Sequence, residues 1–195
     1  MTPIGILISG RGSNMEAIVR NTHDGILRGL CNVEVVISNV QTAPGLSIAR
    51  GLGVSTEVVS SASKKRRRFE EDMIEVLQRY GVDYVVLAGF MRILSPHFIR
   101  RYRNRIINIH PADTERFRGL GGYDWAFRQR LAATKITVHL VDEGVDTGRI
   151  LAQREVDLRG AETLAEVERR GLAAEHEFYS EVLRGIVRGD IRFGE

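Results

Sequence analysis

The chain has 195 residues, of which 43% are hydrophobic, enough to bury a full core in one domain. Its 28 basic and 25 acidic residues leave a net charge of only +3, which does not indicate nucleic-acid binding. The single cysteine, Cys31, excludes an internal disulfide framework, and the absence of a long apolar stretch or an export signal predicts a cytoplasmic protein without a membrane partner.

Short apolar runs alternate with segments of helical periodicity along the first half of the chain. Residues 4–8, 33–37, 54–59, 84–88 and 105–109 have the length and β-branched content of buried strands. Residues 13–21, 44–52, 64–80 and 95–102 are the expected helices between them. Strict alternation predicts an α/β fold with a doubly wound, mostly parallel sheet and helices on both faces. Such sheets bind ligands at the carboxyl ends of their strands.

The pattern changes in the last third of the chain. Residues 135–142 and 150–158 are expected strands, joined by a loop at 143–148, and they extend the sheet in another direction. Residues 161–188 form an amphipathic segment that closes the fold. We therefore expect a single domain over residues 1–195.

The first candidate site is the loop Ser9-Gly10-Arg11-Gly12-Ser13-Asn14, directly after the first strand. Two glycines let a ligand approach the backbone, and a helix beginning at Ser13 or Asn14 directs free N–H groups at an anion such as phosphate. The sequence does not match the P-loop pattern and lacks the third glycine of the dinucleotide fingerprint. A purely structural turn therefore remains the alternative.

The second candidate is the apolar turn after the strand at 84–88. Phe90, Met91, Ile93 and Leu94 could line a slot for a flat, largely apolar ring, with Arg92 available to an anionic tail. Ordinary core packing is the alternative explanation for such clustering.

The third candidate is Asn108-Ile109-His110-Pro111, read with Asp146 in the glycine-flanked loop. Asn108 and His110 are two residues apart on a strand, so they point to the same face, which at the strand end is the ligand crevice. A carboxylate beside a histidine raises the histidine pKa and favours imidazolium, which can donate a proton to an oxyanion or a departing amine. An amide, an imidazole and a carboxylate together suit an acyl-type transfer. A lone histidine, by contrast, is usually structural.

Four blocks, in this order, resemble the phosphoribosylglycinamide formyltransferase family of folate-dependent formyltransferases. They are the loop at 9–14, Ala88-Gly89-Phe90-Met91-Arg92-Ile93-Leu94-Ser95, Asn108-Ile109-His110-Pro111, and Val138-His139 with Asp142-Glu143-Gly144-Val145-Asp146-Thr147-Gly148. The match extends from residue 4 to Glu175-His176. The resemblance implies a Rossmann-like fold with a phosphate-binding part at about 1–100 and a catalytic loop and folate site at about 101–195.

The resemblance also implies a reaction, in which the formyl group of 10-formyltetrahydrofolate passes to the amine of 5-phosphoribosylglycinamide in purine biosynthesis. Asn108 and protonated His110 would stabilise the oxyanion, and Asp146 would hold His110 cationic. The implied contacts with the phosphorylated substrate are Gly12, Ser13, Asn14 and Glu175. The implied folate contacts are Arg66, Met91, Arg92, Ile93, Leu94, Asn108, Asp142, Glu143, Gly144, Val145 and Asp146. No metal is implied, the partners are small molecules, and monomer and homodimer remain open.

Residues 112–125 depart from the family pattern, with charged residues and paired glycines where the family has an apolar wall beside the amine substrate. Arg149 replaces a usual proline. Leu172 stands where a longer polar residue often holds the phosphate, with Arg169 or Arg170 as possible substitutes. Three hypotheses follow: the glycinamide ribonucleotide formyltransferase, an enzyme that formylates another amine or hydrolyses 10-formyltetrahydrofolate, and a non-catalytic folate- or nucleotide-binding protein. The retained Asn108, His110 and Asp146 argue against the third.

Overall fold

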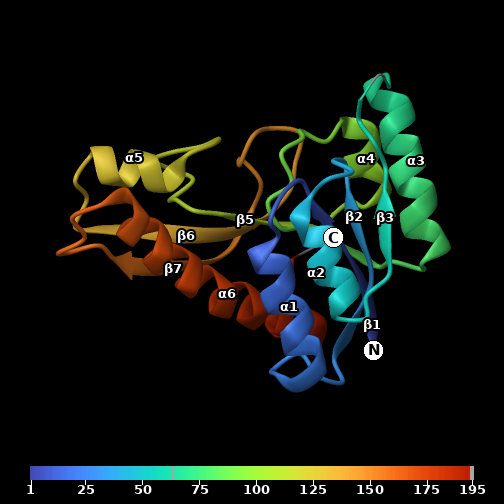
Figure 1. The fold of residues 1–195 in the computed structure, drawn as a ribbon, viewed down its shortest axis with the longest axis horizontal. Coiled ribbons are helices and arrows are strands. Elements are labelled where there is room, and N and C mark those ends of the chain that lie inside the picture. The colour runs from blue at the N-terminus through green and yellow to red at the C-terminus, as the bar shows by residue number, and fades with distance from the viewer. Residues whose placement is uncertain (63, 194–195) are drawn as a thin grey trace.

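A seven-stranded sheet forms the centre of the molecule, in the order β3-β2-β1-β4-β5-β6-β7 (Figure 1). The computed structural model describes residues 1–62 and 64–193. Neighbouring strands pair in parallel from β3 to β5, whereas β5 with β6 and β6 with β7 pair antiparallel. The strands are β1 (Thr2–Ile8), β2 (Cys31–Ser38), β3 (Thr56–Val58), β4 (Tyr84–Leu87), β5 (Ile106–His110), β6 (Ala133–Leu140) and β7 (Ile150–Asp157).

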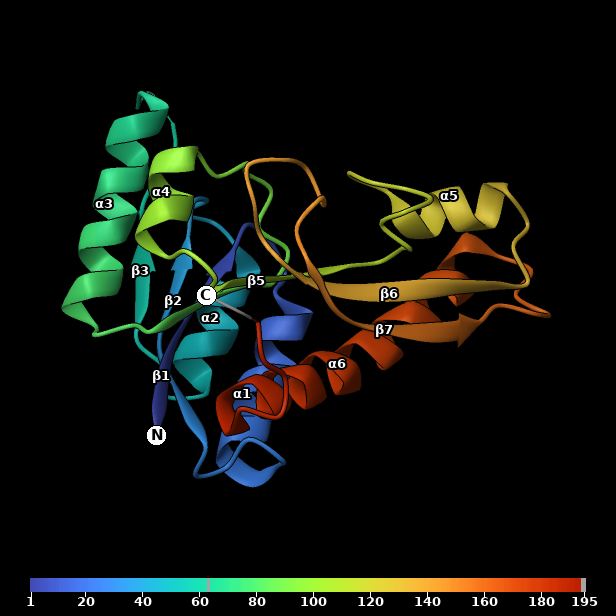
Figure 2. The ribbon, with the colours of Figure 1, turned by 180° about the vertical axis from the view of Figure 1, so that it is seen from behind.

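Helices cover both faces of the parallel part of the sheet, as predicted. The helices are α1 (Ser13–Asp24), α2 (Pro44–Gly51), α3 (Arg66–Arg79), α4 (Pro96–Arg101), α5 (Gly122–Arg128) and α6 (Leu164–Arg188). Helices α1, α2 and α6 share one buried apolar cluster with the sheet, and α3 and α4 share the other. Figures 1 and 2 show β6 and β7 reaching away from the parallel strands, with α6 running beneath both parts.

Side-chain alternation along the strands creates these two cores. Ile4, Ile6 and Ile8 of β1 enter the cluster beneath α1 and α6, whereas Leu7 enters the cluster beneath α3. The fully buried Tyr179 of α6 places its hydroxyl 3.0 Å from the carbonyl oxygen of Leu87 and 2.9 Å from that of Ile107. Helix α6 is thereby anchored at the carboxyl ends of β4 and β5, where the site lies.

Three sequence-based expectations differ from the structure. The strand expected over residues 54–59 is only three residues long, because β3 is an edge strand that pairs with β2 alone. The final helix begins at Leu164 rather than at residue 161, capped by the Thr163 side chain. Helix α5 was not predicted at all. Among the described residues, no helix is long and apolar enough to cross a membrane.

Candidate functional site

A cavity of about 500 Å³ opens at the carboxyl ends of β4 and β5, where the topology predicts a ligand site. Its walls come from the turn after β4, the end of β5, the segment before α5 and the loop between β6 and β7. The lining residues are Leu87, Gly89, Phe90, Met91, Arg92, Ile93, Leu94, Asn108, Ile109, His110, Pro111, Gly119, Leu120, Gly121, His139, Val141, Asp142, Gly144, Val145 and Asp146. The second and third candidate motifs therefore share one cavity.

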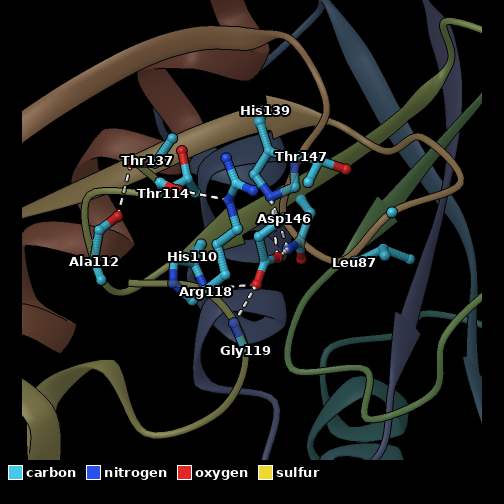
Figure 3. A network of polar contacts seen from close by, with 12 residues as sticks. Leu87, His110, Ala112, Thr114, Arg118, Gly119, Thr137, His139, Asp146 and Thr147 are labelled. Carbon is cyan, nitrogen blue, oxygen red and sulfur yellow. Dashed lines mark hydrogen bonds and ion pairs between the residues drawn. The ribbon is translucent and has the colours of Figure 1, made fainter. Parts of the chain in front are cut away.

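Asp146 lies at the polar end of this cavity, between three groups that face its carboxylate (Figure 3). Its Oδ2 atom accepts a hydrogen bond from the Gly119 N–H at 2.8 Å and lies 3.3 Å from His110 Nδ1. Its Oδ1 atom lies 3.4 Å from His139 Nε2. The Asp146 backbone has φ of 51°, a left-handed conformation that is strained for a residue other than glycine. The loop thus holds this carboxylate in place at a cost in backbone energy.

Asn108 and His110 reach Asp146 together, as their spacing on β5 predicts. The Asn108 amide donates to Asp146 Oδ1 at 3.4 Å and lies 3.2 Å from His139 Nε2. His139 faces Asn108 directly, because the two residues are partners in the antiparallel register of β5 and β6. Its Nδ1 atom lies 2.8 Å from the Leu140 carbonyl oxygen, and its Nε2 atom faces both the Asn108 amide and the Asp146 carboxylate. The protonation of Nε2 decides whether it accepts from Asn108 or donates to Asp146.

The ring of His110 is almost completely buried, with 4% of its surface exposed. Its Nε2 atom lies 3.0 Å from the carbonyl oxygen of Phe117, and its ring stacks on that of Phe117. Burial lowers the pKa of His110 below its ordinary value of 6.5, and the nearby Asp146 carboxylate and Phe117 carbonyl offset only part of that effect. Burial thus opposes the expected cationic form of His110, whereas the acceptors that face both ring nitrogens, Asp146 and the Phe117 carbonyl oxygen, favour it. A cationic His110 therefore stays a prediction.

The Asp146 carboxylate itself is stabilised as an anion. Burial alone would raise its pKa, but hydrogen bonding from His139 and Gly119 and the positive charge that His110 can carry outweigh burial. The Asp146 pKa consequently lies below the ordinary aspartate value of 3.8. The site therefore places a fixed carboxylate beside the His110 imidazole.

The wall assigned to the folate by resemblance lies at the apolar end of the cavity. Met91 and Ile93 are 58% and 62% exposed and face the opening, whereas Leu94 is buried. Arg66 of α3 reaches this wall by donating to the Ile93 carbonyl oxygen at 2.7 Å. Among residues 142–146, which the resemblance assigns to the folate, only Glu143 does not line the cavity; it lies 3.8 Å from Arg100 on the exposed side.

The residues assigned to the phosphorylated substrate form a second cluster, outside the lining of the cavity. Gly12 has a left-handed backbone with φ of 71°, and α1 begins at Ser13 as predicted. Asn14 donates to the Glu175 Oε2 atom of α6 at 2.5 Å, so the predicted pair meets across two helices.

The arginines suggested as substitutes at the phosphate end are engaged elsewhere. Arg169 and Arg170 both donate to the carboxylate of Glu166. Arg170 also donates to the carbonyl oxygen of Arg159 at 2.9 Å. Neither arginine is therefore free to replace the polar residue that the family carries at the position of Leu172. Within residues 1–62 and 64–193, no group of three or more His, Cys, Asp or Glu side chains could hold a metal ion.

Sequence reasoning missed two side chains that the structure brings to these clusters. His139 was part of a quoted motif, but only the register between β5 and β6 puts it opposite Asn108. Tyr123 of α5 donates its hydroxyl hydrogen to Glu175 Oε1, a contact between residues 52 positions apart. No local pattern indicates either contact, because each depends on tertiary structure.

Comparisons with known proteins agree with the resemblance. Residues 3–183 match the family model described as formyl transferase. The chain is 33% identical over 193 residues to the phosphoribosylglycinamide formyltransferase of Escherichia coli, covering 98% of this chain and 90% of that protein. It is 35% identical to the trifunctional purine biosynthetic protein adenosine-3 of Bos taurus, again over 98% of this chain, but it spans only 19% of the length of that relative. A crystal structure of glycinamide ribonucleotide transformylase 1 from Symbiobacterium toebii superposes with a TM-score of 0.93 at 38% identity, covering 100% of this chain and 91% of that one.

Proposed function

Because the chain belongs to the formyl transferase family, we propose that it transfers the formyl group of 10-formyltetrahydrofolate to the amine of 5-phosphoribosylglycinamide, a step of purine biosynthesis. The observation that carries this proposal is the convergence of Asn108, His110 and Asp146 at the polar end of the cavity. Relatives named phosphoribosylglycinamide formyltransferase match the chain over almost its full length. A purely ligand-binding protein would not need that arrangement of an amide, an imidazole and a carboxylate.

The cavity suits the folate co-substrate in size and chemistry. Its volume of about 500 Å³ lies within the usual range for small-molecule sites. Met91, Ile93 and Val145 offer apolar surface to a flat ring system, and the amide N–H groups and carboxylate at the inner end offer polar contacts. Arg92 lines the opening, so its guanidinium group is available to an anionic tail, and Arg66 lies beside it, held by the Ile93 carbonyl oxygen and by Glu70.

The arrangement supports addition of the amine to the formyl carbon, followed by loss of the folate. 10-Formyltetrahydrofolate supplies a formyl carbon bonded to N10; a new C–N bond forms at this carbon, and later its bond to N10 breaks. Asn108 Nδ2 donates to the oxygen that gains the electron pair. His110, held beside Asp146 through its Nδ1 atom, carries the proton that the amine loses to the departing N10.

The segment before α5 favours a second candidate, in which the same donor site formylates another amine or transfers the formyl group to water. Phe117 places its carbonyl oxygen 3.0 Å from His110 Nε2, in direct contact with the proposed proton carrier. This carbonyl belongs to residues 112–125, which depart from the family pattern. The acceptor is therefore the part of the proposal that most needs an experiment.

The decisive assay follows release of tetrahydrofolate from 10-formyltetrahydrofolate by the purified protein, with and without 5-phosphoribosylglycinamide. We expect release that depends on the ribonucleotide and an equal amount of formylated product. Release at the same rate without the ribonucleotide would contradict the proposal and favour water or another amine. No release in either condition would favour a binding protein.

Gly148 offers a test of how firmly the loop must hold Asp146. A Cβ at this position would lie 1.7 Å from the carbonyl oxygen of Leu140, so Gly148→Ala must displace the loop that carries Asp146. A displacement near 1 Å can cost about 10²-fold, and we expect a loss of that size in kcat/KM in the assay above. Gly51→Ala is the matched control, since a Cβ there meets nothing within 4 Å. Equal activity of the two variants would show that loop position does not limit the reaction.

The protonation state of His110 can be measured directly by NMR titration of its ring. Because burial lowers the pKa of this ring, its midpoint in the folded protein should lie below 6.5. The Asp146 carboxylate raises the His110 pKa, so Asp146→Asn should move the midpoint to still lower pH. A midpoint above 6.5 in the wild-type protein would instead support a cationic His110 and the oxyanion role expected from the sequence.

A further inference from the structure

A buried carboxylate connects the substrate end of α1 with α5 and α6. Glu175 is 5% exposed, and each of its oxygens has one donor: Asn14 Nδ2 on Oε2 and the Tyr123 hydroxyl on Oε1. Tyr123 is itself 8% exposed. It is the second residue of α5, directly beyond the segment that reaches Asp146 and His110.

Space for the phenol exists only because residue 171 is a glycine. A Cβ at Gly171 would lie 2.1 Å from Tyr123 Cζ and 2.4 Å from its hydroxyl oxygen. The ring therefore lies directly against the backbone of α6, one turn before Glu175. Tyr123 and Gly171 form a matched pair, and Tyr123 belongs to the segment that departs from the family pattern.

Most of the hydrogen-bonding capacity that remains on Glu175, Tyr123 and Asn14 is acceptor capacity; the second amide hydrogen of Asn14 is the remaining donor. Each Glu175 oxygen keeps a second lone pair, because each has one donor in the structure. The Oδ1 atom of Asn14 is buried and has no hydrogen-bond partner among the described residues. An array of acceptors recognises hydroxyl or ammonium hydrogens and repels phosphate, which suits the N-terminus of α1 instead.

We propose that Tyr123 is a positioning residue for acceptor specificity: its hydroxyl holds the Glu175 carboxylate in the orientation in which that carboxylate, a substrate contact implied by the resemblance, accepts from the ribose hydroxyls of the acceptor. This inference rests on the proposed function, since it concerns the ribonucleotide acceptor. It places the selection of the acceptor on α5, the one helix that the sequence did not predict, rather than on a basic residue near Leu172.

The charge state of Glu175 explains why loss of the Tyr123 hydroxyl should weaken binding of the ribonucleotide. Burial raises the pKa of this carboxyl group, and the hydrogen bonds from Tyr123 and Asn14 offset part of the increase. Without the Tyr123 hydroxyl only one donor remains, so the neutral acid gains population. A protonated carboxyl is a poorer acceptor for a ribose hydroxyl than a carboxylate is.

Tyr123→Phe removes one oxygen atom and keeps the ring that fills the space at Gly171. We expect the KM for 5-phosphoribosylglycinamide to rise about tenfold or more, with kcat and the KM for 10-formyltetrahydrofolate within about twofold of the wild type. Calorimetry should show an equal loss of affinity for the ribonucleotide. Analogues of the ribonucleotide that lack the 2′- or the 3′-hydroxyl give a further test. For at least one of them, the affinity difference between the wild type and Tyr123→Phe should be smaller, because the hydrogen bond that Tyr123 supports is already missing.

Tyr80→Phe is the matched control, since Tyr80 also donates to a glutamate, Glu57, on the distant edge of the sheet. Gly171→Ala is the second variant: it displaces the ring and should raise the same KM while Tyr123 keeps its hydroxyl. An unchanged KM for the ribonucleotide in Tyr123→Phe, or an equal rise in the KM for both substrates, would overturn the inference.

Failure of the proposed function gives a different result. In that case the wild-type protein shows no turnover that depends on the ribonucleotide. Binding of ribose 5-phosphate, followed by NMR in the wild type and in Tyr123→Phe, then tests the inference by itself. Equal binding by the two proteins would overturn it, and weaker binding by the variant would support it.

Discussion

Asp146→Asn is expected to lower kcat by about 10²–10⁴-fold while leaving the affinity for the folate largely intact. An asparagine that keeps its oxygen at the Oδ2 position still accepts from the Gly119 N–H and still faces His110, but its NH2 group then faces the Asn108 amide and His139. His110 also loses the negative charge that stabilises its protonated form. The apolar wall at Met91 and Ile93 is unchanged, so the binding surface for the folate remains.

Steady-state kinetics measures the expected loss of kcat, and calorimetry with a folate ligand measures whether folate affinity is retained. Asp157→Asn makes the same chemical change at the end of β7, where Asp157 pairs with Arg159 on the surface, and should leave kcat unchanged. A kcat for Asp146→Asn within about threefold of the wild type would show that the carboxylate is not part of the proton chemistry.

The parts of the fold that could be predicted from the sequence are those set by local patterns. Buried parallel strands need continuous apolar runs, so β1, β2, β4 and β5 were located within two residues at each end. The period of two along β5 was enough to place Asn108 and His110 on one face. Because the carboxyl ends of β4 and β5 meet at one edge, the cavity was also expected where it lies.

The parts that could not be predicted depend on tertiary contacts. Helix α5 follows the left-handed Gly121 and begins with Gly122, a sequence with weak helical propensity. Its position is set by Tyr123 lying against Gly171 and by Trp125 stacking on Phe117 at 5.0 Å between ring centroids. No such pair is visible in a sequence pattern.

The His110 pKa also depends on tertiary contacts. Proximity to Asp146 was readable from the motifs, and by itself it raises the pKa. The opposing contribution is burial of the ring beneath Phe117, and burial depends on how residues 112–121 fold. The sequence therefore indicates the partner of His110 but not the opposing effect of burial on its pKa.

His110→Ala is expected to lower kcat by about 10²–10⁴-fold, because it removes the only group that the proposed mechanism uses to carry the proton from the amine to N10. His23→Ala, an exposed change in the last turn of α1, should have no effect on kcat. Urea unfolding of each variant checks that any loss of activity is not a loss of fold, since removal of a buried ring leaves a cavity.

The double variant His110→Ala with Asp146→Asn distinguishes a coupled pair from two independent contributions. Independent contributions would multiply, so the double variant would lose the product of the two single losses. If Asp146 acts mainly by orienting His110 and stabilising its charged form, its removal matters little once the ring is gone. We therefore expect the double variant to be within about tenfold of His110→Ala alone. A fully multiplicative loss would instead assign Asp146 a role of its own, exerted through Asn108, His139 or the substrate directly.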